Sequence, residues 1–163
     1  MTLTLFSDYT LRVLMFAAAR RPEQFSIEEV ADAFSLSRHH LAKVVHHLAK
    51  RGDLESRRGR GGGVVLARDP QRIGIGDVVR ASETGAALVE CFDPSRNQCI
   101  LAGSCRLQTV LNEATRAFYT VLDKYTLADL VEGGHGRRLR QALGLATAGA
   151  GSGPEPSLGG QPS

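Results

Sequence analysis

The chain has 163 residues, of which 42% are hydrophobic, and it carries a formal net charge of +3 at pH 7. This length suits one domain with appendages, and no apolar run approaches the roughly 18 residues of a membrane span, so a membrane-spanning protein is excluded. The first ten residues, MTLTLFSDYT, lack the charged and apolar regions of a signal peptide. We therefore expect a cytoplasmic protein without a membrane partner.

The first predicted element is an amphipathic helix over residues 8–20. Ser7 is expected to be its N-cap, and Asp8 lies in the first turn, where the helix dipole favours an acid. Pro22 marks the end of this helix.

A helix-turn-helix is predicted next. Ser26 and Glu29 form the capping box of a short helix, IEEVADAF, and a three-residue turn, SLS, follows. Ser37 is then expected to cap a helix that runs to the stop signal at Gly52. Two short helices joined by so short a turn are typical of DNA-binding proteins.

The second helix of this motif has the character of a recognition helix. Its apolar stripe predicts the core-facing side, and its polar side chains are expected to point away from the core. No two of its four histidines are three or four residues apart, so a metal site on this helix is not expected. The predicted DNA contacts here are Ser37, Arg38, His39, His40, Lys43 and His46.

Two short strands, over residues 54–57 and 64–67, are predicted to form a wing. They are joined by a glycine-rich run that permits a tight reversal, and Arg57, Arg58 and Arg60 lie at its tip, placed for phosphate or minor-groove contacts. Residues 38–60 hold seven Lys or Arg residues against the two acids Asp53 and Glu55. The run lacks the motifs of a nucleotide-binding loop.

All three cysteines of the chain, Cys91, Cys99 and Cys105, fall in the segment CFDPSRNQCILAGSC, after a short helix predicted over residues 76–83. An odd number of thiols argues for a reducing compartment and against a disulfide framework. Structural zinc usually uses tighter pairs, and gaps of seven and five residues suit a loop around a larger group. An iron–sulfur cluster is the favoured interpretation. Structural zinc and a metal-free thiol redox switch stay open as alternatives.

A long amphipathic helix is predicted after Cys105, with apolar residues recurring at helical spacing as far as Tyr125. Such a helix needs a partner surface. It could pack on its own domain, but the preceding domain is small and a palindromic DNA site favours two-fold symmetry, so we expect antiparallel pairing in a homodimer.

Four segments are therefore expected. They are a winged helix-turn-helix DNA-binding domain over residues 1–83, a cluster-binding loop over 84–105, a dimerisation helix and cap over 106–134, and a disordered tail over 135–163.

Four features of the sequence together resemble those of one known family. They are the first helix with SDYTLRVLM, the SIEEVA helix start, the wing RRGRGGG, and three cysteines before a long helix. Over roughly residues 1–134 the chain resembles the winged-helix iron–sulfur repressors typified by IscR and NsrR. The resemblance implies a mainly α fold with a small β-hairpin wing and a long C-terminal dimerisation helix. Seven residues separate the first two cysteines here, where that family commonly has five.

The fourth ligand distinguishes two branches of that family. The IscR branch has a histidine three residues after the last cysteine, and this chain has Gln108. It is more similar to the nitric-oxide-sensing NsrR branch, in which an early aspartate, here Asp8, comes from the other subunit. The resemblance thus implies a 4Fe-4S cluster, with 2Fe-2S as the alternative, whose ligands are Cys91, Cys99, Cys105 and Asp8 of the partner subunit. Without the resemblance, Asp8 is explained as a helix-start acid paired with Arg12.

The function implied is a nitric-oxide-sensing repressor. It would bind double-stranded operator DNA as a homodimer and release it when the cluster is nitrosylated. An IscR-like regulator of iron–sulfur or redox status, and a winged-helix protein with structural zinc, are the alternatives. An enzyme is not expected, because no nucleophile, base and orienting acid are visible as a set.

Overall fold

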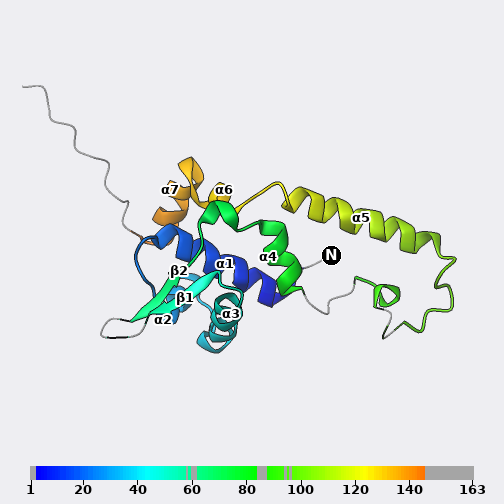
Figure 1. Cartoon of the computed structure of the whole chain (residues 1–163), viewed down its shortest axis with the longest axis horizontal. Helices are drawn as coiled ribbons and strands as arrows, with labels where there is room; N and C mark the ends of the chain where they lie inside the picture. The colour runs from blue at the N-terminus through cyan, green and yellow to red at the C-terminus, as the bar shows by residue number, and fades with distance from the viewer. Residues whose placement is uncertain are drawn as a thin grey trace, which may run out of the picture.

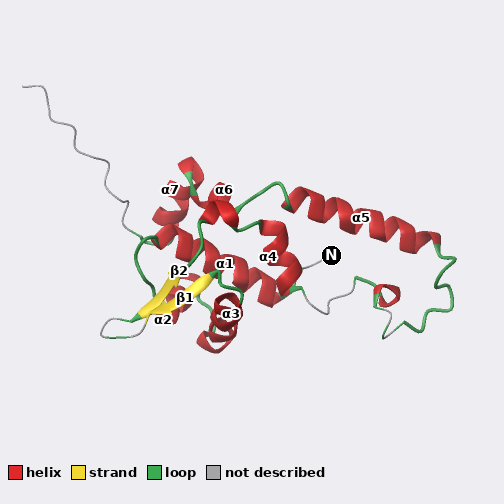
Figure 2. Ribbon diagram, in the orientation of Figure 1, coloured by secondary structure: helices red, strands yellow, loops and turns green. Residues whose placement is uncertain are grey.

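The computed structural model describes residues 3–57, 59, 62–83, 88–93, 95 and 97–145. These residues form a mainly helical fold with a two-stranded antiparallel hairpin (Figure 2), which confirms the expected fold class. Figure 1 shows a body built from α1 to α4, the hairpin, α6 and α7, and a long helix, α5, that extends away from it. Within the described residues, no helix is both long enough and apolar enough to cross a membrane.

Helix α1, Leu5–Arg20, is the central helix of the body. Its N-cap is Thr4, whose Oγ1 accepts a hydrogen bond from the Ser7 amide at 3.1 Å. The expected N-cap, Ser7, is therefore wrong, since this residue is buried in the first turn. Thr4 and Ser7 are both good capping residues, and the longer helix is preferred because its extra turn packs Phe6 against the core.

The helix-turn-helix consists of α2, Ile27–Phe34, and α3, Arg38–Lys50. The predicted capping box of α2 is confirmed: the Ser26 amide donates to Glu29 Oε2 at 2.7 Å, and the Glu29 amide donates to Ser26 Oγ at 3.1 Å. Ser37 is the N-cap of α3, but its side chain makes no capping hydrogen bond.

The wing is formed by β1, Leu54–Arg57, and β2, Gly63–Leu66, so β2 begins one residue earlier than predicted. In the antiparallel register, Leu54 pairs with Leu66 and Arg57 pairs with Gly63.

The core surrounds α1, which packs against α3, α4 (Ile75–Ser82), α6 (Leu127–Val131) and β2. A 3-10 turn, η1 (Pro70–Arg72), leads into α4. Large side chains that are completely buried come from α1, α3 and α6 and from two connections between elements: Leu14, Phe16, Phe25, Leu41, Leu48, Ile73 and Leu127. This packing fixes α3 and the wing on one body.

Helix α5, Arg106–Leu122, has no buried residue. Only its last turns pack against the body, through Phe118, Tyr119 and Leu122. Backbone contacts follow directly after the helix: the Ile75 amide donates to the Tyr125 carbonyl at 2.9 Å, and the Leu127 amide donates to the Ile73 carbonyl at 2.8 Å. The sequence left two partner surfaces open for α5, its own domain and a second copy of the helix. The domain covers little of the helix.

A further helix, α7, spans Gly133–Ala142. It extends into the range 135–163 for which disorder was expected, so that expectation is wrong for residues 135–142. Glycines and arginines give this segment the composition of a tail, but Leu139, Leu143 and Leu145 pack against the core and offset the weak helix propensity. Residues 146–163 lie outside the described residues.

Candidate DNA-binding surface and cysteine loop

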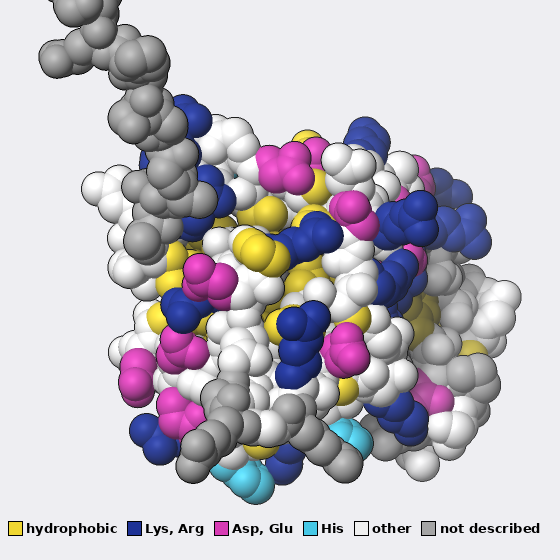
Figure 3. Space-filling model, turned by 60° about the vertical axis from the view of Figure 1, so that its left-hand side comes forward, with side chains coloured by type: hydrophobic (Ala, Val, Ile, Leu, Met, Phe, Trp, Pro, Cys, Tyr) yellow, Lys and Arg dark blue, Asp and Glu magenta, His cyan; other side chains and the backbone are white. Residues whose placement is uncertain are grey.

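The polar face of α3 is the most prominent candidate site on the body. Leu41, Val44, Val45 and Leu48 are buried, as their spacing predicts, and this fixes the rotation of the helix. Figure 3 shows histidine side chains along the lower edge of the molecule, where α3 lies in Figure 1. The structure brings all of the predicted contacts of this helix to the surface as exposed residues: Ser37, Arg38, His39, His40, Lys43 and His46.

His47 differs from the other polar residues of α3. It was expected to point away from the core, but it is half-buried, with its ring edge-on to Phe6 of α1 at a centroid distance of 5.3 Å. Its Nε2 is buried and finds no hydrogen-bond partner among the described residues. Burial lowers the pKa of His47 below its ordinary value, and the nearby charge of Arg51 lowers it further. His47 is therefore a packing residue between α3 and α1.

The wing extends the basic surface. Arg57, at the end of β1, is exposed, whereas the predicted contacts Arg58 and Arg60 lie outside the described residues. Gly59 in the turn has a φ of +122°, a conformation that side-chain-bearing residues rarely adopt, which explains a glycine there.

Asp53 anchors the base of the wing and is a residue whose importance the sequence did not reveal. Its carboxylate is completely buried and accepts hydrogen bonds from Arg51 Nε and Arg68 Nη1, both at 2.8 Å. The Asp53 amide also donates to the Leu48 carbonyl of α3 at 2.9 Å. Asp53 thus ties the end of α3 to the base of the hairpin.

The three cysteines lie on the loop between α4 and α5, and all are free and half-buried. Cys91 belongs to a 3-10 turn, η2 (Glu90–Phe92), and Cys105 is the N-cap of α5. Cys99 lies between them, where its amide donates to Asn97 Oδ1 at 3.0 Å.

Gln108 connects the two ends of this loop. From the first turn of α5, its Nε2 donates to the Cys91 carbonyl at 3.3 Å. The position at which the IscR branch has a histidine is therefore occupied here by a residue that holds the backbone of the first cysteine.

The predicted ligands are not gathered within one chain. Among the described residues, no group of three His, Cys, Asp or Glu side chains is arranged to hold a metal ion. Asp8 lies on α1 and forms an ion pair with Arg12 at 2.9 Å. The loop therefore carries the three thiols without a preformed ligand cage.

The donor set nevertheless fits an iron–sulfur cluster. Cys105 begins a 17-residue helix whose first turn has no acidic residue and whose N-cap side chain makes no capping hydrogen bond. Cysteine sulfur is the preferred ligand of these clusters, and all three cysteines lie on the one segment that ends at this helix start.

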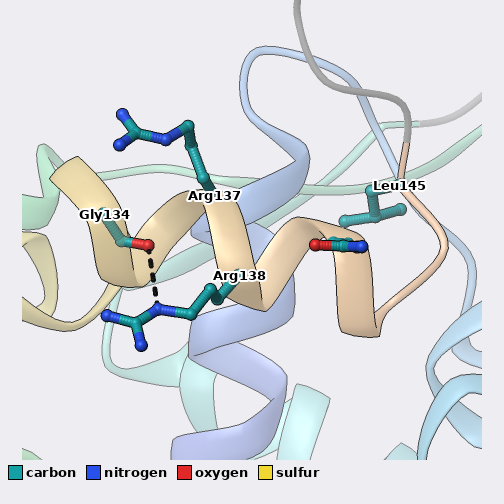
Figure 4. Close-up of a pocket in the computed structure, with 5 residues that line it drawn as sticks. Gly134, Arg137, Arg138 and Leu145 are labelled. Carbon is teal, nitrogen blue, oxygen red and sulfur yellow. Dashed lines mark hydrogen bonds between the residues drawn. The ribbon is translucent and has the colours of Figure 1, made fainter.

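An open hollow of about 770 Å³ lies on α7, lined by Gly134, Arg137, Arg138, Gln141 and Leu145. Figure 4 shows Arg137 and Arg138 projecting to different sides of the helix, with Arg138 Nε directed at the Gly134 carbonyl at 3.5 Å. Polar groups that converge on one point, which a catalytic site requires, are not found among these lining residues.

Comparison with known proteins identifies the family. The Rrf2 family, described as an iron-dependent transcriptional regulator, matches residues 3–133. The HTH-type transcriptional regulator NsrR of Bacillus subtilis (strain 168) is 50% identical over 133 residues, which cover 81% of this chain and 91% of that protein. NsrR of Geobacillus kaustophilus (strain HTA426) is also 50% identical over 133 residues, which cover 81% of this chain and 90% of that protein.

A solved structure agrees with this result. CymR, the global cysteine regulator of B. subtilis, has a TM-score of 0.64 at 26% identity, over 80% of this chain and 95% of that one. The chain is therefore not an enzyme but a transcriptional regulator, and it belongs to the Rrf2 family.

Proposed function

We propose that this protein is a nitric-oxide-responsive iron–sulfur repressor that binds operator DNA as a homodimer. The observation that carries the proposal is the set of three free, half-buried cysteines on one loop that ends at the start of α5. The name NsrR of the relatives that are 50% identical supports it.

The ligands in this proposal are Cys91, Cys99, Cys105 and Asp8 of the partner subunit. A ligand from the partner agrees with the position of Asp8 on α1, where, among the residues that the structure describes, it joins no metal-binding group of its own chain. The cluster would be 4Fe-4S, with 2Fe-2S as the alternative, and it would supply the reactivity toward nitric oxide. The chain's own contribution is to hold the cluster across two subunits.

Operator recognition is assigned to α3 and the wing. The exposed residues of α3 would enter the major groove, and Arg57, Arg58 and Arg60 would contact phosphates or the minor groove. Pairing through the exposed face of α5, which includes Leu107, Val110 and Val121, would place two such surfaces on a palindromic site.

Coupling between the cluster loop and DNA would pass through α1. Asp8 lies in the first turn of α1, which packs directly against α3. At the start of α1, the Thr4 amide donates to Glu83 Oε1 at 2.7 Å, and Glu83 immediately follows α4 on the path to the cysteines. Release of Asp8 would therefore let α1 and α3 shift together, which would change the spacing of the two recognition helices.

Anaerobic purification tests the proposal. We expect a brown protein with stoichiometric iron and sulfide, operator binding, and loss of that binding after stoichiometric nitric oxide. Replacing Cys91, Cys99 or Cys105 by Ala should each abolish the chromophore while helical content is retained, and Ser104→Ala, on the same loop, is the matched control. A colourless protein containing zinc, or a metal-free protein that forms a reversible disulfide, would instead support the two alternatives.

A further inference from the structure

Helix α5 meets the body at its C-terminal end, where Phe118 and Leu122 pack partly buried against the core beside a small polar cluster. Arg80 of α4 donates to Asp123, directly after α5, from Nη1 to Oδ1 at 2.8 Å and from Nη2 to Oδ2 at 2.5 Å. The Arg80 guanidinium also lies over the Tyr119 ring, 4.6 Å from its centroid. We call Gly76, Arg80, Tyr119 and Asp123 the α4–α5 clamp.

Gly76 makes room for this contact. A Cβ built at position 76 would overlap Asp123 Oδ1 and lie 3.0 Å from its Cγ and 3.1 Å from Arg80 Nη1. Its φ is not in the left-handed region, so backbone conformation does not require a glycine here. A methyl group at this position would instead displace the Asp123 carboxylate from its place against α4.

The clamp contributes orientation more than stability. The side chains of Arg80 and Asp123 are 42% and 45% exposed, and exposed ion pairs add little to the free energy of unfolding. Arg80 lowers the pKa of Asp123 below its ordinary value, mainly through their hydrogen bond. The planar Arg80 guanidinium makes two hydrogen bonds to Asp123 and lies over the Tyr119 ring, and this combination favours one relative orientation of α4 and α5.

A small change at the clamp has a large effect at the other end of α5. The helix has 17 residues, and at a rise of about 1.5 Å per residue it is about 25 Å long. Cys105 caps the far end, and no residue of α5 before Phe118 packs against the core. A tilt of about 10° at the clamp would therefore move Cys105 by about 4 Å, a distance that follows from this helix length.

We propose that the α4–α5 clamp is a positioning device that fixes the angle between α5 and the DNA-binding body. If two copies pair through α5, this angle sets the separation of their recognition helices and hence the spacing of operator half-sites that the dimer accepts. The inference rests on the proposed function in this one respect, the pairing of two copies through α5.

The test measures half-site spacing with the cluster-loaded protein. A palindromic operator is selected from random DNA by the wild type, and affinities are compared for the selected spacing and for spacings one base pair shorter and longer. Asp123→Asn and Gly76→Ala should each reduce the preference for the selected spacing, on the order of tenfold. Asp77→Asn removes only the longer 3.4 Å contact of Arg80, and Gly74→Ala adds a methyl group near the flexible Asp77 side chain, so both should behave like wild type.

Failure of the clamp proposal and failure of the proposed function give different results. A wild type that is monomeric by sedimentation, or that has no spacing preference, would contradict the dimeric repressor itself. A dimeric wild type with a clear preference that Asp123→Asn and Gly76→Ala both retain would overturn the clamp alone. Arg80→Lys keeps the charge but cannot make the two-point contact, so it replaces Gly76→Ala if that variant does not fold.

Discussion

The carboxylate of Asp8 lies 2.9 Å from the guanidinium of Arg12, one turn further along α1. Arg12 Nε also donates to the second carboxylate oxygen, Oδ1, at 3.0 Å. The two side chains are 39% and 41% exposed, respectively, so the pair adds little to stability and the carboxylate remains within reach of a second molecule. An acid of this kind can serve as a helix-start residue in one chain and as a ligand for a group held by another.

Asp8→Ala separates these two roles. If Asp8 is the fourth ligand, the variant should still assemble iron and sulfide on three thiolates, but with an altered resonance Raman spectrum and an altered response of DNA binding to nitric oxide. If Asp8 acts only at the helix start, the variant should lose roughly 0.3 to 1 kcal/mol in the free energy of unfolding and keep the wild-type spectrum.

Arg12→Ala is the control, because it removes the same ion pair and leaves the carboxylate. Identical spectra and identical DNA release for wild type and Asp8→Ala would direct the search for the fourth ligand to Glu90 and Asp93, beside the first cysteine.

The basic surface makes two kinds of contact that mutations can distinguish. Arg58→Ala and Arg60→Ala should weaken operator binding and flatten its salt dependence by about one unit of log–log slope per lost phosphate contact. His39→Ala and Lys43→Ala should instead relax the preference for a particular base pair, by about 1 to 3 kcal/mol. Arg137→Ala, exposed on α7, is a charge-matched control for these measurements of affinity against salt and sequence. Unchanged binding in all four variants would exclude this docking surface.

The helix-turn-helix was predictable because its signals are local. The capping box at Ser26 and Glu29 sets one helix start, and apolar residues three and four positions apart set the buried side of α3. Each signal depends on residues within a few turns of one another, and tertiary packing reinforces it.

The features that sequence could not predict depend on contacts between distant segments. Helix α7 exists because leucines near residue 140 meet the body, although their neighbours favour a tail. His47 is half-buried because Phe6, 41 positions earlier, covers it. The approach of Asp123 to Gly76 joins two segments on either side of the cysteine loop, and no local pattern indicates it.

His47 should make folding sensitive to mild acid. Burial lowers the pKa of His47 in the folded protein below the ordinary value of 6.5. As the pH falls through about 6.5, His47 of the unfolded chain therefore takes up a proton, while His47 of the folded protein stays uncharged. The unfolded state then binds more protons, so the free energy of unfolding should decrease until the pH falls below the folded-state pKa. Above about pH 6.5 the residue should have no such effect.

His47→Gln should therefore lose less stability than wild type between about pH 7.5 and about pH 5.5, as measured by urea unfolding. His46→Gln, at the exposed neighbouring position, controls for any acid sensitivity of the rest of the protein. Parallel pH profiles for wild type and His47→Gln would contradict this account.

Asp53→Asn tests whether the buried carboxylate holds the wing. The amide has nearly the same shape, but its NH₂ group cannot accept from an arginine, so one of Arg51 and Arg68 loses its partner. Arg51 and Arg68 are partly exposed and can turn to water, so we expect a loss of about 1 to 3 kcal/mol in the free energy of unfolding, below the cost of breaking a fully buried pair. Glu55→Gln, exposed on β1 of the same hairpin, should change stability by less than about 0.5 kcal/mol.

Because Asp53 ties α3 to the hairpin, operator affinity should also fall in Asp53→Asn and not in Glu55→Gln. Wild-type stability and affinity in Asp53→Asn would show that backbone pairing alone positions the wing.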